Sequence, residues 1–247
     1  MMTMTVANDP PVRVNQALDK EVIRRTFSRS GRVHIQGFFE PSVAQAIYEA
    51  LSQRTPWQLC FNSGPRHVDI GVDGFESLSL EDREKLVTAI HHGARRGFQY
   101  FYAAFPLYDL YAAGLHRDHY LMRVYEFLNS EVFLEFVRDI TGAADIEFAD
   151  AQATLYQAGH FLTTHDDLAE GKHRRAAYVL NFTPQWRADW GGVLQFIDAD
   201  GHLAEGYVPA FNALNLFRVP QKHSVSYVTP AANGGRYSIT GWLRARD

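Results

Sequence analysis

Four residues in the last third of the chain carry side chains that could hold a metal ion and a small acid. His165 and Asp167 are two positions apart, His223 lies 58 residues after His165, and Arg236 follows on a segment that ends at Trp242. Two histidines and one carboxylate can occupy one face of an octahedral iron(II) ion and leave three positions open. Arginine presents a planar fork of donors that matches a carboxylate. This set indicates iron-dependent oxygenase chemistry, with Arg236 clamping a dicarboxylate co-substrate such as 2-oxoglutarate.

The spacing of the first pair suggests how the fold would position it. Residues two apart on a β-strand face the same side, so His165 and Asp167 would share one metal while Asp166 pointed away. Thr163 and Thr164 are β-branched, which favours a strand at this point. A His-x-Asp triplet alone is a weak motif, and the competing reading is a pair of ordinary polar strand residues with a surface arginine. The strand-like text around His223 and Arg236 favours the metal site.

Composition limits the classes of protein that the chain could represent. The 247 residues suit one large domain, and 46% hydrophobic with 21% charged residues are globular values. A formal net charge of −4 and a pI near 6.2 argue against general binding to nucleic acid or anionic lipid, although a local basic patch stays open. We therefore expect no direct nucleic-acid binding and no membrane association.

The location follows from cysteine usage and from the first residues. Cys60 is the single cysteine, so neither an intrachain disulfide nor a cysteine metal cluster can form. The first eleven residues lack the charged and apolar regions of a signal peptide. The apolar stretch 97–114 is interrupted by Gln99, Pro106 and Asp109, too often for a bilayer-spanning helix. We expect a cytoplasmic protein.

The order of the elements predicts the fold class, which is mainly β with α. Residues 1–14 look like a flexible tail, and 15–247 look like one domain with a helical layer over 15–143 and a jelly-roll core mainly over 144–247. Apolar periodicity and capping residues predict helices over 15–30, 41–54 and 79–95, with more helix between 107 and 140. Short alternating segments predict strands, with hairpin-type turns at 198–201 and 232–235. The segments are 32–38, 57–61, 68–72, 176–182, 193–197, 203–209, 213–217, 225–228 and 237–243.

An ordered set of motifs resembles the prolyl 4-hydroxylase-like iron(II)/2-oxoglutarate dioxygenases, including those that hydroxylate ribosomal proteins and translation factors. The set runs from about Gly37 to Leu243. Its members are Gly37-Phe-Phe, Phe127-Leu-Asn-Ser, Tyr156-x-x-Gly, His165-x-Asp, Tyr178-Val-Leu-Asn, Asp189-Trp-Gly-Gly, Phe211-Asn-Ala-Leu-Asn, His223 and Arg236 through Trp242. The resemblance implies a double-stranded β-helix fold.

The same resemblance implies the cofactors and the residues that hold them. It implies iron ligation by His165, Asp167 and His223, with 2-oxoglutarate and dioxygen as co-substrates, and leaves room for ascorbate. It implies that Arg236 binds the distal carboxylate of 2-oxoglutarate and that Tyr156 hydrogen-bonds the co-substrate. The chain departs from some relatives at Val179, where they carry a second tyrosine. Its neighbour Tyr178 would face the opposite side of the strand.

The favoured substrate is a prolyl residue in a protein, hydroxylated with release of succinate and carbon dioxide. The resemblance places Trp242 at the substrate, and the basic run 172–175 adds Arg174 and Arg175 as candidates for attracting an acidic peptide. Two alternatives remain open: the same chemistry on a free amino acid or other small molecule, and a non-catalytic jelly-roll binding module. The aromatic set within 98–105 is more typical of core than of a pocket, though part of it could wall a substrate cleft.

Overall fold

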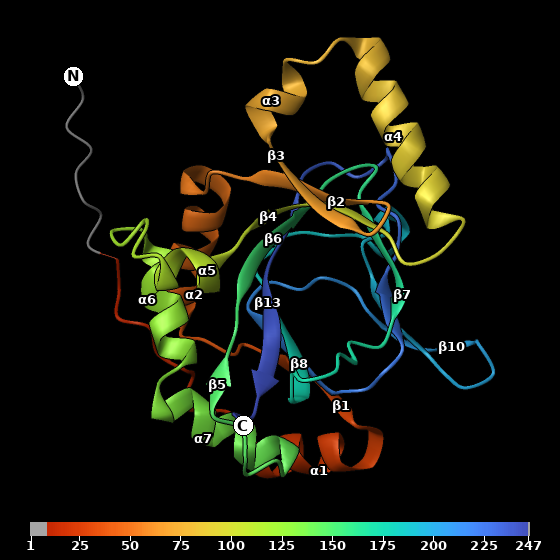
Figure 1. Ribbon diagram of the computed structural model, residues 1–247. Coiled ribbons are helices and arrows are strands. Elements are labelled where there is room, and N and C mark those ends of the chain that lie inside the picture. The colour runs from red at the N-terminus through yellow and green to blue at the C-terminus, as the bar shows by residue number, and fades with distance from the viewer. Residues whose placement is uncertain (1–8, 247) are drawn as a thin grey trace, which may run out of the picture.

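The computed structural model describes residues 9–246, and its centre is one antiparallel sheet that curves into a barrel-like shape (Figure 1). Along the sheet the order is β1-β11-β8-β13-β6-β4-β7-β12-β9-β10, while β2 pairs with β3 and β4, and β5 pairs with β13. The strands are β1 (Arg32–Gln36), β2 (Gln58–Ser63), β3 (Arg66–Gly71), β4 (Tyr100–Phe105), β5 (Phe148–Ala149), β6 (Gln152–Tyr156), β7 (Phe161–His165), β8 (Arg174–Asn181), β9 (Leu194–Ile197), β10 (Leu203–Tyr207), β11 (Ala213–Arg218), β12 (His223–Val225) and β13 (Arg236–Arg244).

Helices cover this sheet on the outside (Figure 1). They are α1 (Lys20–Ser30), α2 (Pro41–Glu49) with a π-helical turn (Ala50–Arg54), α3 (Val72–Glu76), α4 (Leu80–Ala94), α5 (Leu107–Ala112), α6 (Tyr120–Leu128), α7 (Glu131–Thr141) and a 3-10 turn (Ala188–Trp190). Among residues 9–246, no helix has the length and apolar character to span a membrane. The mainly β fold with a helical layer, expected from the sequence, is confirmed.

The largest core lies between helices α1, α2, α6 and α7 and one layer of the sheet. Helix α7 shows how the sequence builds it, because Phe133, Phe136, Val137 and Ile140 repeat at helical spacing and are all buried. Gly142 ends this helix in the left-handed conformation, as expected from its sequence position. A second core packs α4 against the hairpin formed by β2 and β3.

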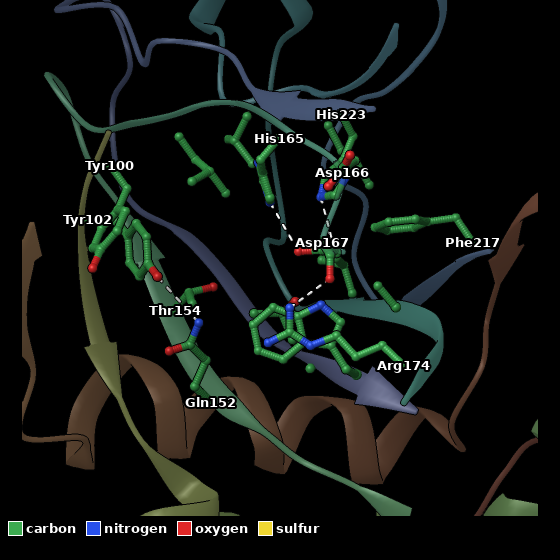
Figure 2. Close-up of a pocket in the computed structure, with 18 of the residues that line it drawn as sticks. Tyr100, Tyr102, Gln152, Thr154, His165, Asp166, Asp167, Arg174, Phe217 and His223 are labelled. Atoms are coloured by element: carbon green, nitrogen blue, oxygen red, sulfur yellow. Dashed lines mark hydrogen bonds and ion pairs between the residues drawn. The ribbon is translucent and has the colours of Figure 1, made fainter. Parts of the chain in front are cut away.

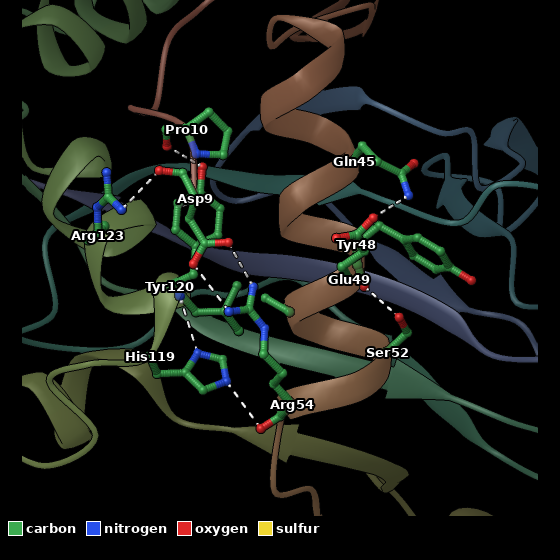
Figure 3. Close-up of polar contacts among 12 residues, drawn as sticks. Asp9, Pro10, Gln45, Tyr48, Glu49, Ser52, Arg54, His119, Tyr120 and Arg123 are labelled. Atoms are coloured by element: carbon green, nitrogen blue, oxygen red, sulfur yellow. Dashed lines mark hydrogen bonds and ion pairs between the residues drawn. The ribbon is translucent and has the colours of Figure 1, made fainter. Parts of the chain in front are cut away.

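The start of the described chain is attached to the body of the protein. Residues 1–8 of the expected tail lie outside the described residues. Further on, Asp9 forms an ion pair with Arg54 at 3.1 Å, and the Pro10 carbonyl accepts a hydrogen bond from Tyr120 at 2.9 Å (Figure 3). Val14 is buried and bridges to Phe39. Residues 9–14 therefore pack against the helical layer.

Three details differ from the sequence interpretation. Helix α1 begins at Lys20, because Asp19 accepts the capping hydrogen bond from Val22. Strand β4 was not expected, and it and the expected strands β1 to β3 join the same sheet as the strands after residue 143, so residues 15–143 are more than a helical layer. The turn at 232–235 does not close a hairpin, because β12 pairs with β7 and β9 while β13 pairs with β6 and β8. Local turn chemistry could not reveal that the chain crosses between layers here.

Buried His160 predicts a loss of stability in acid. Burial lowers the pKa of His160 from 6.5 to about 4, so the folded state favours the neutral ring. The unfolded chain gains a proton first as the pH falls through 6.5, and the free energy of unfolding then falls by about 3 kcal/mol by pH 4. His160→Asn keeps an acceptor for the Gln157 backbone N–H and should flatten this pH dependence in denaturant unfolding.

The matched control for this prediction is an exposed histidine. His202→Asn, in the turn between β9 and β10, should leave the wild-type pH dependence unchanged. An identical acid slope in wild type and His160→Asn would contradict the assignment.

Candidate metal and co-substrate site

The three expected metal-binding side chains meet at one end of the barrel interior (Figure 2). His165 ends β7, His223 begins β12, and the two residues are direct partners in the antiparallel register. His165 Nε2 lies 3.3 Å from Asp167 Oδ1, and His223 Nε2 lies 3.4 Å from Asp167 Oδ2. Potential ligand atoms of all three residues lie within 4.8 Å of one another. Segments 58 residues apart are thus joined by strand pairing into one cluster.

Asp167 reaches this cluster by a route that the sequence did not indicate. Strand β7 ends at His165, and Asp167 adopts a left-handed backbone with φ 64°. Strand alternation therefore does not place Asp167, and the expectation that one continuous strand carries both side chains was wrong. A non-glycine residue in this conformation is held by its surroundings. Here the Asp167 carbonyl accepts a hydrogen bond of 2.8 Å from Arg174.

Both imidazoles are oriented with the same nitrogen toward the cluster. Nδ1 of His165 lies 2.9 Å from the Thr163 carbonyl, and Nδ1 of His223 lies 2.7 Å from the Gln221 carbonyl. A carbonyl only accepts, so each Nδ1 carries a proton, and Nε2 is the nitrogen that faces the cluster. Burial and the nearby His165 lower the pKa of His223 to about 4, so its ring is neutral at neutral pH.

The third side chain supplies the negative charge. Burial raises the pKa of Asp167, but its contacts with His165 and His223 outweigh burial and hold the pKa below its ordinary value. Ligands about 2.1 Å from an octahedral metal stand about 3.0 Å apart at adjacent positions. The observed separations of 3.3 and 3.4 Å are close to that spacing. Two imidazoles that turn Nε2 toward the cluster and one carboxylate therefore fit a divalent ion such as iron(II).

Arg236 lines the same cavity and is a buried cation without a counter-charge. Its residue is only 2% exposed, and it forms no ion pair with any carboxylate in residues 9–246. Its Nε has no hydrogen-bond partner, and its guanidinium carbon lies 4.9 Å from the centre of the Tyr156 ring. Burial lowers the pKa of Arg236, and Tyr156 partly offsets this. An isolated buried charge is costly, so this position calls for an anionic ligand.

The cavity that joins these groups has a volume of about 490 Å³, within the usual range of small-molecule sites. Tyr156 lines it from β6, and its ring stacks on Tyr102 with centroids 5.0 Å apart. Val179 also faces the cavity, whereas Tyr178 points into the helical core and donates a hydrogen bond to the Asp150 carbonyl. The opposite orientation of Tyr178 matches the expectation from strand alternation. Val179 therefore gives the cavity an aliphatic surface at the position where some relatives carry a second tyrosine.

Trp242 and the two arginines of the basic run lie in different places. Trp242 lines the cavity, and the Arg174 guanidinium carbon lies 3.5 Å from the centre of its ring. The Trp242 indole nitrogen lies close enough to Asp167 to lower the pKa of that carboxyl, yet it makes no hydrogen bond of normal geometry. Arg175 lies outside the cavity, where it pairs with Asp145 at 2.6 Å. Of the two arginines, only Arg174 reaches the cavity.

The sequence missed several cavity residues that alternate along strands. Tyr100 and Tyr102 on β4 face the cavity, while Phe101 and Phe105 between and after them are buried in the cores. On β6, the side chains of Gln152 and Thr154 share the face of Tyr156 (Figure 2). Period-two alternation was present in both segments and could have separated cavity from core.

Comparison with known proteins agrees with this geometry. Residues 151–244 match the sequence model of the 2OG-Fe(II) oxygenase superfamily, and these residues contain the three metal-binding candidates and Arg236. This part of the chain is similar to the 2OG-Fe(II) oxygenase domains of that superfamily. The family implies iron(II), 2-oxoglutarate and dioxygen as the reactive components. Of these, iron(II) is matched by a suitable His-Asp-His group.

Several proteins that the chain resembles in sequence or structure are named prolyl hydroxylases. The chain is 33% identical over 120 residues to the Mus musculus protein named prolyl 3-hydroxylase OGFOD1, covering 46% of this chain and 22% of that protein. The chain thus spans about a fifth of the curated relatives it matches. A Pseudomonas putida prolyl-4-hydroxylase shares the fold with a TM-score of 0.57 and 17% identity over 92% of this chain and 99% of its own.

A third similarity is to a Trichoplax adhaerens prolyl hydroxylase, solved with a peptide fragment of hypoxia inducible factor. It has a TM-score of 0.56 and 14% identity, over 92% of this chain and 89% of its own. At these identities the two solved structures establish the shared fold of the oxygenase jelly roll.

Proposed function

We propose that the chain is an iron(II)- and 2-oxoglutarate-dependent dioxygenase that hydroxylates a prolyl residue in a protein, releasing succinate and carbon dioxide. The observation that carries the proposal is the uncompensated charge of Arg236 in the cavity that also holds His165, Asp167 and His223. A dicarboxylate can bind at both ends of this cavity. One carboxylate then pairs with Arg236, and the rest of the molecule extends toward the metal-binding group. Iron, when bound, supplies the oxidising chemistry.

The protein's own residues position and shield the reactants. His165, Asp167 and His223 would hold the ion, and their orientation is set by backbone carbonyls and by Arg174. Arg236 orients 2-oxoglutarate by binding its distal carboxylate. Tyr156 lies beside the Arg236 guanidinium and hydrogen-bonds the co-substrate. The aliphatic side chain of Val179 lines the cavity and helps to exclude water from it. In this scheme no side chain acts as a general acid or a general base.

The proposed substrate rests on sequence similarity and on the aromatic wall. Similarity to a protein named prolyl 3-hydroxylase supports proline as the target. Trp242 offers a flat face on which a pyrrolidine ring can pack. The Arg174 guanidinium stacks on the Trp242 indole and places a positive charge at the cavity. This charge favours acidic residues beside the target proline. Arg175, which pairs with Asp145 outside the cavity, has at most a long-range electrostatic role.

Removing Trp242 should separate co-substrate consumption from hydroxylation. In Trp242→Ala, 2-oxoglutarate is still consumed slowly, because Arg236 and the metal group are intact. Hydroxylation of prolyl peptides should fall at least about a hundredfold, because misplacement by 1 Å is enough for such losses. The assay compares succinate release with a one-oxygen mass gain on peptide proline, with ascorbate present as an auxiliary reductant. Normal hydroxylation in this variant would contradict the role of Trp242.

The two arginines provide a matched pair for the substrate proposal. Arg174→Gln should weaken binding of acidic prolyl peptides in a salt-dependent manner, since it removes the charge beside Trp242. Arg175→Gln is the control, because this exposed side chain pairs with Asp145 outside the cavity. Equal peptide affinity in both variants would contradict a role for Arg174.

One experiment separates this proposal from its alternatives. The protein is incubated with iron(II), 2-oxoglutarate and either prolyl peptides or free proline, and hydroxylation is followed by mass spectrometry. Turnover of free amino acids alone would favour a small-molecule oxygenase. No turnover of 2-oxoglutarate under any condition would favour a binding module.

The remaining assignments are extensions of the same proposal. We propose that residues 15–247 work as one oxygenase domain acting on a protein or peptide partner, without binding nucleic acid directly. A cytoplasmic location is proposed because the single cysteine is compatible with a reducing compartment.

A further inference from the structure

A second group of potential metal ligands lies on the hairpin of β2 and β3, apart from the His-Asp-His group. Cys60 lies directly opposite Asp69 in the antiparallel register, and His67 precedes Asp69 by two residues on the same face. Cys60 Sγ is 2.9 Å from Asp69 Oδ1, and His67 Nε2 is also 2.9 Å from that oxygen. Two strands thus bring a thiol, an imidazole and a carboxylate to one point. Potential ligand atoms of the three lie within 4.8 Å of one another.

We propose that Cys60, His67 and Asp69 bind a thiophilic divalent metal ion, for which Zn²⁺ is the best fit. Zinc takes thiolate, imidazole and carboxylate ligands in tetrahedral geometry. At bond lengths of about 2.0–2.3 Å, tetrahedral ligands stand about 3.3–3.5 Å apart. The two observed contacts of 2.9 Å need to lengthen by only about half an ångström.

Exposure of the group allows an ion to enter and leaves one position for water. Cys60 is 3% exposed, whereas the side chains of His67 and Asp69 are 54% and 44% exposed. Burial raises the pKa of the Cys60 thiol, with Asp69 adding to the effect, so the metal-free thiol keeps its proton. Binding replaces that proton with the metal: the S–H bond breaks, the proton passes to solvent, and the sulfur electron pair binds the ion.

The site lies beside the wall of the oxygenase cavity. His67 Nδ1 lies 2.5 Å from the Tyr100 hydroxyl, and Tyr100 lines that cavity from β4. With Nε2 on the ion, Nδ1 keeps its proton and donates a hydrogen bond to the Tyr100 hydroxyl oxygen. Figure 2 shows Tyr100 at the edge of the cavity, on the neighbouring strand. A bound ion therefore ties the hairpin to the cavity wall.

Cobalt(II) gives a test that is specific to this site. Thiolate ligation of Co²⁺ produces a charge-transfer absorption in the near ultraviolet, and Cys60 is the chain's single cysteine. The wild-type protein titrated with Co²⁺ should develop this absorption and reach a plateau whose amplitude corresponds to one thiolate-bound ion per chain, while the His-Asp-His group can take up a second ion without adding to the absorption. Added Zn²⁺ should abolish it by replacing the cobalt.

Variants separate a three-ligand site from binding by the thiol alone. Cys60→Ser should remove the absorption, and His67→Ala or Asp69→Ala should each weaken Co²⁺ binding about tenfold or more. Both latter side chains are half-exposed, so the fold should tolerate their loss. Tyr100→Phe is the matched control and should keep the absorption. No absorption in the wild type at excess Co²⁺, or unchanged affinity in both alanine variants, would overturn the proposal.

The outcome does not depend on the proposed oxygenase activity. The His-Asp-His group contains no sulfur, so His223→Ala should retain the thiolate absorption while losing 2-oxoglutarate turnover. In that background, Zn²⁺ should raise the thermal midpoint, and adding Cys60→Ser should cancel the rise. A rise that survives the loss of Cys60 would count against this site.

Discussion

His223→Ala should abolish iron-dependent turnover of 2-oxoglutarate. The substitution removes one of the two imidazoles from a group whose ligand atoms lie within 4.8 Å of one another. Loss of a residue that only orients a metal ligand costs about 10–100-fold in affinity or activity, so loss of a ligand should cost more. We expect turnover to fall at least about a hundredfold, measured as succinate release with iron(II) in excess. His165→Ala should behave in the same way.

The control for this prediction is the neighbouring acid, Asp166. Its side chain accepts a hydrogen bond of 3.0 Å from the Leu168 backbone and, contrary to the expectation that it points away, it lines the cavity, but it is not one of the three residues whose ligand atoms lie within 4.8 Å of one another. Asp166→Asn keeps an acceptor for that hydrogen bond and should retain iron binding and turnover. Full activity in His223→Ala, or equal loss in Asp166→Asn, would show that the metal lies elsewhere. Circular dichroism of each variant separates loss of ligand from loss of fold.

Arg236→Met should have opposite effects on the free protein and on co-substrate binding. In the free protein it replaces a buried, unpaired cation by an apolar side chain, which should raise the free energy of unfolding by roughly 1–4 kcal/mol. The same change removes the partner of the distal carboxylate. It should weaken 2-oxoglutarate binding by about 2–5 kcal/mol, equal to a loss of roughly 30-fold or more. Denaturant unfolding and anaerobic calorimetry with iron(II) measure the two effects.

Two further variants sharpen this result. Arg236→Lys keeps the charge and loses the bidentate fork, so it should mainly raise the 2-oxoglutarate requirement. Arg218→Met removes an exposed arginine on β11 and should leave both stability and co-substrate affinity nearly unchanged. If Arg236→Met binds 2-oxoglutarate as the wild type does, another residue holds the distal carboxylate. Destabilisation of the free Arg236→Met protein would show that the cation is already compensated.

Local patterns were enough to predict elements whose position depends on residues close in sequence. The apolar repeat of α7 and its end at Gly142 are examples, because helix packing and capping act over a few residues. The same holds for the opposite orientations of Tyr178 and Val179, which follow from strand alternation. The sequence also predicted the class of chemistry, because two histidines, an acid and an arginine in strand-like segments have few explanations other than metal binding.

Other features depended on residues that are distant in sequence. Asp167 joins the metal group through a left-handed backbone supported by Arg174, and no local pattern predicts that conformation. Arg174 and Arg175 are adjacent and look alike in sequence, but successive strand residues face opposite sides, so one stacks on Trp242 and the other pairs with Asp145. Only the folded chain shows which side is the cavity.

The sequence by itself determined the residue types that can bind iron and a dicarboxylate, and the periodicities that form the helices and strands. The tertiary structure decided which of those residues meet. His165 and His223 become neighbours through pairing of β7 with β12, and Cys60 meets Asp69 through pairing of β2 with β3. It also decided that Arg236 has no carboxylate partner among residues 9–246, because burial and charge pairing are properties of the assembled interior. Such contacts depend on the free energy of the whole packed chain, which local sequence does not encode.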